Sequence, residues 1–185
     1  LAANSVQAAC LVQLMASVMG DTIAPHILPL VIENIGDENW HKREAAAYMF
    51  GALCSGVSTG AVDKHLAQLL PQLVKLAAEE THQKTRETIV WVLSRVVEYH
   101  YSAIQEESVG SIVRVAQMGL SDKNGGISHQ CCKILNKIGE NQADTDENAP
   151  TNILSKYFSS VVQGLMTNSE RPDHQENNLR MASHE

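Results

Sequence analysis

The chain has 185 residues, of which 44% are apolar and only 4% are aromatic. This composition is typical of a globular protein and excludes an intrinsically disordered chain. The net charge of −7 argues against a nucleic-acid backbone or an anionic membrane surface as the main partner, and it suits a basic one.

Helical periodicity accounts for most of the first half of the chain. Apolar residues recur at helical spacing over five segments: 5–19, 23–35, 40–54, 62–78 and 81–100. Gly20 ends the first segment, and residues 37–39 supply polar side chains that cap the third. The small and polar residues 56–60 predict a loop, and Thr81 is the expected cap of the fifth helix.

The second half continues this pattern with a polar interruption. Further helices are predicted over 103–121, 126–140, 152–167 and from about His174 onward. Residues 122–126 have turn chemistry, whereas the acidic stretch 140–150 predicts a solvated loop. Because the chain begins without Met and ends while a helical pattern is still running, we expect it to be a piece of a longer array.

The helices come in pairs that repeat along the chain. Pro29 and Pro71 occupy matching positions in the first helices of two successive pairs. The second helices share an apolar stripe at i, i+3 and i+7: Ala47, Phe50 and Cys54, then Val90, Leu93 and Val97, then Cys131, Ile134 and Ile138. A helical hairpin of roughly 40 to 47 residues is the HEAT or armadillo unit, and such hairpins must stack because none can bury its own apolar face.

The repeat predicts an all-α fold, a right-handed α-solenoid of antiparallel HEAT hairpins that is a fragment of a longer superhelix. Its parts follow from the period. We expect the second helix of a truncated HEAT repeat over 1–20, HEAT repeats over 21–60, 61–101 and 102–141, an acidic inter-repeat loop over 142–151 and an incomplete HEAT repeat over 152–185.

The reactive side chains form no catalytic or metal constellation in the sequence. The four cysteines lie on apolar helical stripes, which indicates core residues in a reducing compartment: Cys10, Cys54, Cys131 and Cys132. His129 precedes Cys132 by three residues, but a second Cys/His pair at ligand spacing is missing, as is a Gly-rich phosphate loop. We therefore expect no enzyme, no cofactor and no metal. We find no signal peptide and no apolar run near the length of a membrane span, and expect a cytosolic or nuclear protein.

Four motifs in chain order resemble the importin-beta (karyopherin-beta) family. Residues 25–29 resemble P-H-V-L-P, residues 35–51 resemble N-x-x-W-R-x-R-[DE]-A-A-x-x-A-F-G, residues 86–91 resemble [RK]-[DE]-T-x-x-W, and residues 170–180 resemble D-R-P-D-x-x-x-N-N-L-R. The matches span the chain from about residue 8 to its end. By this resemblance the chain is the middle of an importin-beta-type receptor, around its eighth to twelfth HEAT repeats.

The resemblance implies a non-enzymatic nuclear import receptor that shuttles between cytoplasm and nucleus through the pores of the nuclear envelope. Such a receptor carries basic cargo directly or binds the basic segment of an importin-alpha-type adaptor. The full-length receptor is expected to bind the Ran GTPase, which in its GTP form releases the cargo, and FG nucleoporins; nucleic acid and membrane are not expected partners. The alternative is a HEAT-repeat scaffold for folded proteins, which salt-sensitive binding of a Lys/Arg-rich peptide would distinguish.

In a HEAT solenoid the second helices line the concave face, so they are the expected site for an extended peptide. Glu44 and Tyr48, like Glu87 and Trp91, are i, i+4 pairs on consecutive second helices. The resemblance implies that acidic residues there pair with Lys and Arg of a basic segment while Trp91 packs against its backbone or aliphatic stems. A cation over Trp91 would add about 0.5 to 2 kcal/mol. Alternatively, Trp91 fills space between hairpins and Glu87 is a solvated charge.

The resemblance extends the expected binding set beyond these four residues. Where the family carries another tryptophan, the alignment gives Cys132 or, shifted by one, Lys133, so one aromatic contact is expected to be missing. The complete set of expected cargo or adaptor contacts is Glu44, Tyr48, Glu87, Trp91, Cys132 and Asn178. Structural roles are expected for three further residues: Trp40 as a staple of the hairpin turn, and Arg43 and Arg86 as bridges to acidic groups such as Asp37 or Glu79.

Overall fold

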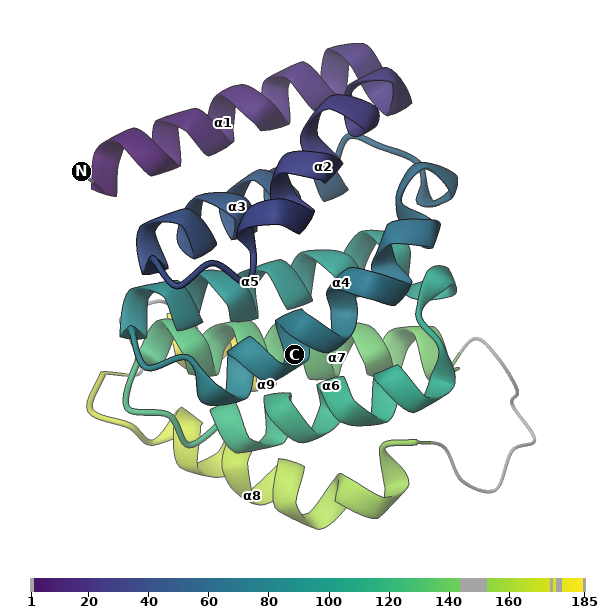
Figure 1. The fold of residues 1–185 in the computed structure, drawn as a ribbon. Coiled ribbons are helices and arrows are strands. Elements are labelled where there is room, and N and C mark those ends of the chain that lie inside the picture. The colour runs from purple at the N-terminus through teal and green to yellow at the C-terminus, as the bar shows by residue number, and fades with distance from the viewer. Residues whose placement is uncertain (1, 144–152, 174, 176–177, 185) are drawn as a thin grey trace. The chain divides into compact units, whose positions relative to one another are not determined.

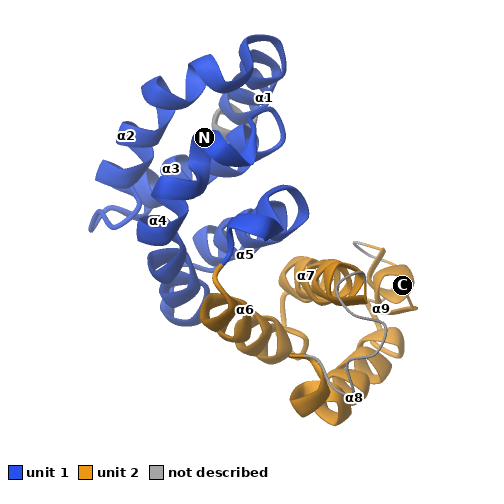
Figure 2. Cartoon of the chain, turned by 90° about the vertical axis from the view of Figure 1, so that its right-hand side faces the viewer, with its two compact units in different colours: residues 1–104 blue, residues 105–185 orange. Residues whose placement is uncertain are grey.

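The computed structural model describes residues 2–143, 153–173, 175 and 178–184, and every regular element in these ranges is helical (Figure 1). Residues 144–151 of the predicted acidic loop and the predicted helix start at His174 lie outside the described residues. The chain divides into two compact units, residues 1–104 and residues 105–185 (Figure 2).

The first unit has two layers of helices. Its elements are α1 (Ala2–Met19), η1 (Gly20–Ile23), α2 (Ala24–Asn34), α3 (Trp40–Cys54), α4 (Thr59–Glu79), α5 (Gln83–His100) and η2 (Tyr101–Ala103). In one layer α3 packs against α1 and α5, and in the other α2 packs on α3 and α4 on α5 (Figure 1). The predicted stripes of α3 and α5, which include Phe50 and Leu93, are buried between these layers, so this part of the prediction is confirmed.

The second unit is also a stack of paired helices. Its elements are α6 (Glu106–Gly119), α7 (Gly125–Ala143), η3 (Ser155–Tyr157), α8 (Phe158–Ser169) and α9 (Leu179–His184). Both α6 and α9 pack against α7 and against α8. The predicted α7 stripe of Cys131, Ile134 and Ile138 is fully buried. The third stripe is therefore confirmed as well.

The turn that starts a second helix has the same hydrogen bonds in both units. Before α3, Asp37 Oδ1 accepts from the Asn39 N–H at 2.8 Å, and Asn39 Oδ1 accepts from the His41 N–H at 3.0 Å. Before α7, Asp122 Oδ1 accepts from the Asn124 N–H and Asn124 Oδ1 from the Gly126 N–H, both at 2.8 Å. The backbone N–H groups in the first turn of a helix have no carbonyl partner within that helix. In both turns the side chains of the Asp-x-Asn sequence accept hydrogen bonds from such groups, so the Asn is the N-cap.

Two predicted helix starts are wrong in detail. The cap of α5 is His82, not Thr81, because His82 Nδ1 accepts from the Thr85 N–H at 3.3 Å. The predicted loop 56–60 is shorter, since Thr59 and the residue after it already belong to α4. Ser58 precedes that helix without capping it, because its N–H and hydroxyl both donate to the Asp21 carboxylate at 2.6 Å.

Arg43 of α3 fastens its own hairpin turn to the next one. Arg43 Nη1 donates to the backbone carbonyls of Asp37 and Glu38, each at 2.8 Å, while its Nε and Nη2 lie 2.7 Å from the Glu80 carboxylate. The predicted partner Glu79 is wrong, because it lies at the end of α4 and pairs with Lys75 in solvent, whereas Glu80 has an extended backbone that directs it inward.

The second unit contains a similar clamp. Arg171, in the turn between α8 and α9, donates to the carbonyls of Asp122 and Lys123 in the turn before α7, and pairs with Asp173 at 2.8 Å. In the first unit, ring stacking adds to the contact made by Arg43. Trp40 stacks on His41 and on His82 of the next hairpin turn, with ring centroids 3.5 and 3.6 Å apart, respectively. These contacts connect each hairpin turn to the next within its unit.

The first helix differs from the prediction in the face that it buries. Ala9 and Ala16 are buried against the unit, whereas Cys10 is exposed and Leu14 and Val18 are mostly exposed, Val18 at 79%. The prediction that Cys10 is a core residue is therefore wrong. The physical reason is that α1 is apolar on nearly all sides, so periodicity could not select its packed face.

One stretch, Gln7–Asn34, is long and apolar enough to cross a membrane, contrary to the expectation that no run approaches this length. Its helical path is broken, because Gly20 has a φ of 57° and starts η1, which redirects the chain. Both α1 and α2 pack against α3. The stretch is therefore two separate helices, α1 and α2. Their packing on α3 explains some of its apolar side chains.

A buried histidine makes the first unit sensitive to acid. His100 is 1% exposed, with Nδ1 3.3 Å from Thr59 Oγ1, and burial lowers its pKa from the usual 6.5. Since the unfolded chain accepts a proton that the folded state resists, unfolding free energy falls as the pH drops below 6.5. We expect His100→Leu to reduce this loss in urea titrations followed by tryptophan fluorescence, and His26→Gln, an exposed control, to retain it. Equal acid sensitivity in both variants would contradict this prediction.

Candidate functional site

Two predicted aromatic residues meet where α3 packs on α5. The rings of Tyr48 and Trp91 lie 5.7 Å apart, tilted by 49°. The indole also lies on the α3 backbone at Gly51, where a Cβ would be only 2.3 Å from Trp91 Cζ3. Both aromatic side chains are half-buried. The pair is thus fixed in position by packing and retains exposed ring surface.

The predicted acidic residues lie one turn before the two rings. Glu44 is 5% exposed, and its buried Oε1 accepts no hydrogen bond from the described residues; Lys84 Nζ lies 3.9 Å away, at the limit of an ion pair. Glu87 is half-buried on α5. A carboxylate that is buried with a single distant cation gains strongly from another hydrogen-bond donor. Glu44 therefore has capacity to accept from a cationic side chain that reaches it.

A positive charge, that of Arg95, lies beside Trp91 on α5. The Arg95 guanidinium carbon lies 5.9 Å from the Trp91 ring centroid and 4.5 Å from that of Tyr99. Arg95 Nη1 donates to the Tyr99 hydroxyl at 3.1 Å and lies 3.5 Å from a Glu98 carboxylate oxygen.

Burial raises the pKa of the neighbouring Cys54 thiol to about 12, and the Arg95 charge only partly offsets that rise. The thiol is therefore neutral.

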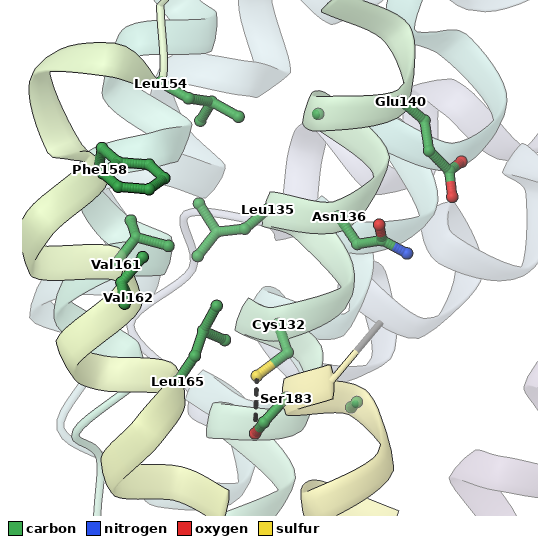
Figure 3. Close-up of a pocket in the computed structure, with 12 residues that line it drawn as sticks. Cys132, Leu135, Asn136, Glu140, Leu154, Phe158, Val161, Val162, Leu165 and Ser183 are labelled. Atoms are coloured by element: carbon green, nitrogen blue, oxygen red, sulfur yellow. Dashed lines mark hydrogen bonds between the residues drawn. The ribbon is translucent and has the colours of Figure 1, made fainter. Parts of the chain in front are cut away.

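The two remaining predicted contacts, Cys132 and Asn178, belong to the second unit. Cys132 is buried in the wall of a cavity of about 290 Å³ between α7 and α8, with its Sγ 3.8 Å from Ser183 Oγ of α9 (Figure 3). Leu135 and Phe158 face each other across this largely apolar cavity (Figure 3). Burial raises the pKa of the Cys132 thiol. Asn178 is exposed at the start of α9 with a φ of 52° and does not line this cavity.

The structure therefore brings Tyr48 and Trp91 together with Glu44 and Glu87 beside them, and it places Cys132 and Asn178 at two separate positions of the second unit. Sequence reasoning missed Gly51 and Arg95. The spacing of Trp91 and Arg95 at i and i+4 on one helix could have revealed their contact. The approach of Gly51 to Trp91 joins two repeats and required the structure.

Comparisons with known proteins show which proteins the chain resembles. Residues 40–96 match a model of HEAT-like repeats, and residues 111–185 match the importin subunit beta-1-like TPR repeats. The chain is 26% identical to importin subunit beta-1 of Arabidopsis thaliana over 93% of its length, and 28% identical to that of Schizosaccharomyces pombe over 98%. The chain is similar to importin subunit beta-1 along nearly its whole length. It spans only 20% and 21% of these two relatives, respectively.

Solved structures have the same fold as the chain. A crystal structure of importin beta matches 95% of the chain, and 21% of its own, with a TM-score of 0.83 and 25% identity. Kap95 in its complex with Nup1 matches 96% of the chain, and 20% of its own, with a TM-score of 0.81; at 24% identity it supports the fold alone. Another similar structure is of Kap95p with RanGDP. The predicted HEAT solenoid and the predicted importin-beta resemblance are both confirmed.

Proposed function

We propose that this importin-beta segment is part of a nuclear import receptor and binds a basic, extended segment of cargo or of an importin-alpha-type adaptor across α3 and α5. The observation that carries the proposal is the Tyr48–Trp91 pair, with its 5.7 Å ring separation, next to Glu44 and Glu87. The rings offer surface for backbone and aliphatic stems, and the carboxylates attract Lys and Arg. No covalent chemistry is involved.

The electrostatics of the chain support this role. A net charge of −7 raises the local concentration of a basic segment and speeds its association. Glu44 adds a specific anchor, because its buried Oε1 would gain a charge-assisted hydrogen bond from a lysine or arginine. In forming this bond, the cation of the partner would replace Lys84 as the ion-pair partner of Glu44. Binding would then combine a general electrostatic attraction with this one exchange of ion pairs.

The wider proposal concerns the whole receptor. Since similar structures are of Kap95 with Nup1 and with RanGDP, we propose that the receptor containing this segment also binds nucleoporins and Ran and shuttles through nuclear pores. Cys132 and Asn178 stay in the proposed contact set as secondary positions. Cys132 would contribute only after its cavity opened, because its thiol is buried.

The test is binding of a fluorescently labelled Lys/Arg-rich peptide at low and moderate salt. We expect the Glu87→Ala, Trp91→Ala double variant to raise Kd at least about tenfold, because truncating an aromatic anchor and a charge typically removes more than 1.4 kcal/mol. The matched control is Glu33→Ala on α2, which removes an exposed charge from a first helix and should leave Kd nearly unchanged. An unchanged Kd in the double variant, or no binding by the folded wild type, would contradict the proposal and favour the scaffold reading.

A further inference from the structure

The Trp91 ring already lies next to a cation of the same helix. Trp91, Arg95 and Tyr99 stand at i, i+4 and i+8 on α5, and the Arg95 guanidinium carbon lies 5.9 Å and 4.5 Å from the two ring centroids. Guanidinium groups within about 6 Å of an aromatic centroid make favourable cation–π contacts. Arg95 therefore already makes the cation–π contact with Trp91 that an arginine of a binding partner would otherwise make.

Arg95 is held firmly in this position. Its side chain is only 15% exposed, Nη1 donates to the Tyr99 hydroxyl at 3.1 Å, and Glu98 lies within ion-pair distance. The charge also extends toward α3, where it opposes the burial-induced rise in the Cys54 pKa. A guanidinium with a hydrogen bond, an ion pair and two ring contacts loses all of them if it moves away. Displacement by an incoming cation is therefore unfavourable.

We propose that Arg95 is a specificity-determining residue that excludes Lys and Arg of a bound segment from the Trp91 ring and leaves that ring to an uncharged, aliphatic side chain. The inference rests on the proposed function, because it concerns the same peptide. Two like charges near one half-buried ring repel, and the low dielectric of the site strengthens this repulsion. Cations of the segment then bind toward Glu44 and Glu87, and Glu87 lies about two helical turns from Arg95, with Trp91 between them.

A fluorescence experiment tests the position of the charge without any partner. The chain has two tryptophans, so Trp40→Phe leaves Trp91 as the sole fluorophore. Since Arg95 attracts anions and repels cations at the ring, iodide should quench Trp91 more than caesium does. We expect Arg95→Gln to lower the ratio of iodide to caesium quenching constants at least about twofold, with neutral acrylamide unaffected. The control Lys75→Gln removes an exposed cation from α4 and should leave the ratio unchanged. An unchanged ratio in Arg95→Gln would overturn the inference.

A peptide experiment tests the selectivity. Each Arg of the basic peptide is replaced in turn by Leu, and Kd is measured for wild type and for Arg95→Gln. At one peptide position we expect wild type to prefer Leu, and Arg95→Gln to shift the ratio of the two Kd values toward Arg at least about tenfold, in line with a desolvated cation–π contact. Should wild type bind while all preferences stay the same in Arg95→Gln, the inference is overturned and the proposed function stands. If neither protein binds any peptide, the proposed function fails and the inference falls with it.

Discussion

Arg43→Met will lower the unfolding free energy of the first unit by about 3 to 5 kcal/mol, because it leaves the buried Glu80 carboxylate without its cation. The Glu80 side chain is 2% exposed and lies 2.7 Å from Arg43. The same substitution removes the two hydrogen bonds to Asp37 and Glu38 that hold the turn before α3. Both tryptophans, Trp40 and Trp91, belong to the first unit, so urea unfolding followed by their fluorescence reports on this unit alone.

The matched control and the pH dependence make this prediction specific. Lys42→Met breaks an ion pair with Asp37 that is open to solvent, since Lys42 is 56% exposed, and should leave the unfolding free energy nearly unchanged. Burial raises the pKa of Glu80, but hydrogen bonds from the His82 N–H and Arg43 outweigh it and hold the pKa below 4.5. Stability from this carboxylate is therefore present above pH 4.5 and lost as the pH falls through the lowered value. Equal effects of the two substitutions would contradict the prediction.

Gly51→Ala will destabilise the first unit by about 1 to 3 kcal/mol despite the better helix propensity of alanine. The new Cβ would lie 2.3 Å from Trp91 Cζ3, so the indole must move off α3 and away from Tyr48. The measurement is urea unfolding together with the emission maximum of Trp91 in the Trp40→Phe background. We expect a red shift as the ring becomes more exposed to water.

A glycine without such a contact provides the control for Gly51. Gly60 lies in the first turn of α4, where an added Cβ would meet nothing closer than Ser58 Oγ at 3.8 Å, so Gly60→Ala should be neutral or stabilising by up to about 1 kcal/mol. In the double variant Gly51→Ala, Trp91→Leu the smaller side chain removes the clash. A loss equal to the sum of the two single losses would show that the two residues are not coupled and would contradict the packing argument.

Helix periodicity and turn chemistry were sufficient to predict the repeat. The start of α3 matches the prediction because Asn39 is a strong N-cap, whose side chain accepts a hydrogen bond from the His41 N–H. The face of α1 could not be predicted, because a helix that is apolar on all sides has no periodic signal. The predicted partner of Arg43, Glu79, was one residue away from the observed partner, Glu80. The two side chains point in different directions because α4 ends at Glu79 and Glu80 is extended, and the exact end of a helix is hard to predict from sequence.

The candidate site was predictable in its residue types and less so in its contacts. The i, i+4 spacing predicted that Glu44 and Tyr48 share one helix and that Glu87 and Trp91 share the next second helix, and these pairs lie on α3 and α5. Burial of Glu44 depends on how α3 packs against α5, and sequence spacing carries no such information. Whether these residues bind a basic segment stays a prediction until the peptide is tested.

The arginine clamps have a mechanical consequence. Because Arg43 joins its own hairpin turn to Glu80 in the next one, a repeat that opens leaves a buried charge unpaired in its neighbour. The neighbour is weakened at the same moment, so the nearest-neighbour coupling of the array is strong at this junction. When the chain is pulled from its ends in an optical trap, the two hairpins that Arg43 links should extend in one step, and Arg43→Met should divide that step into two.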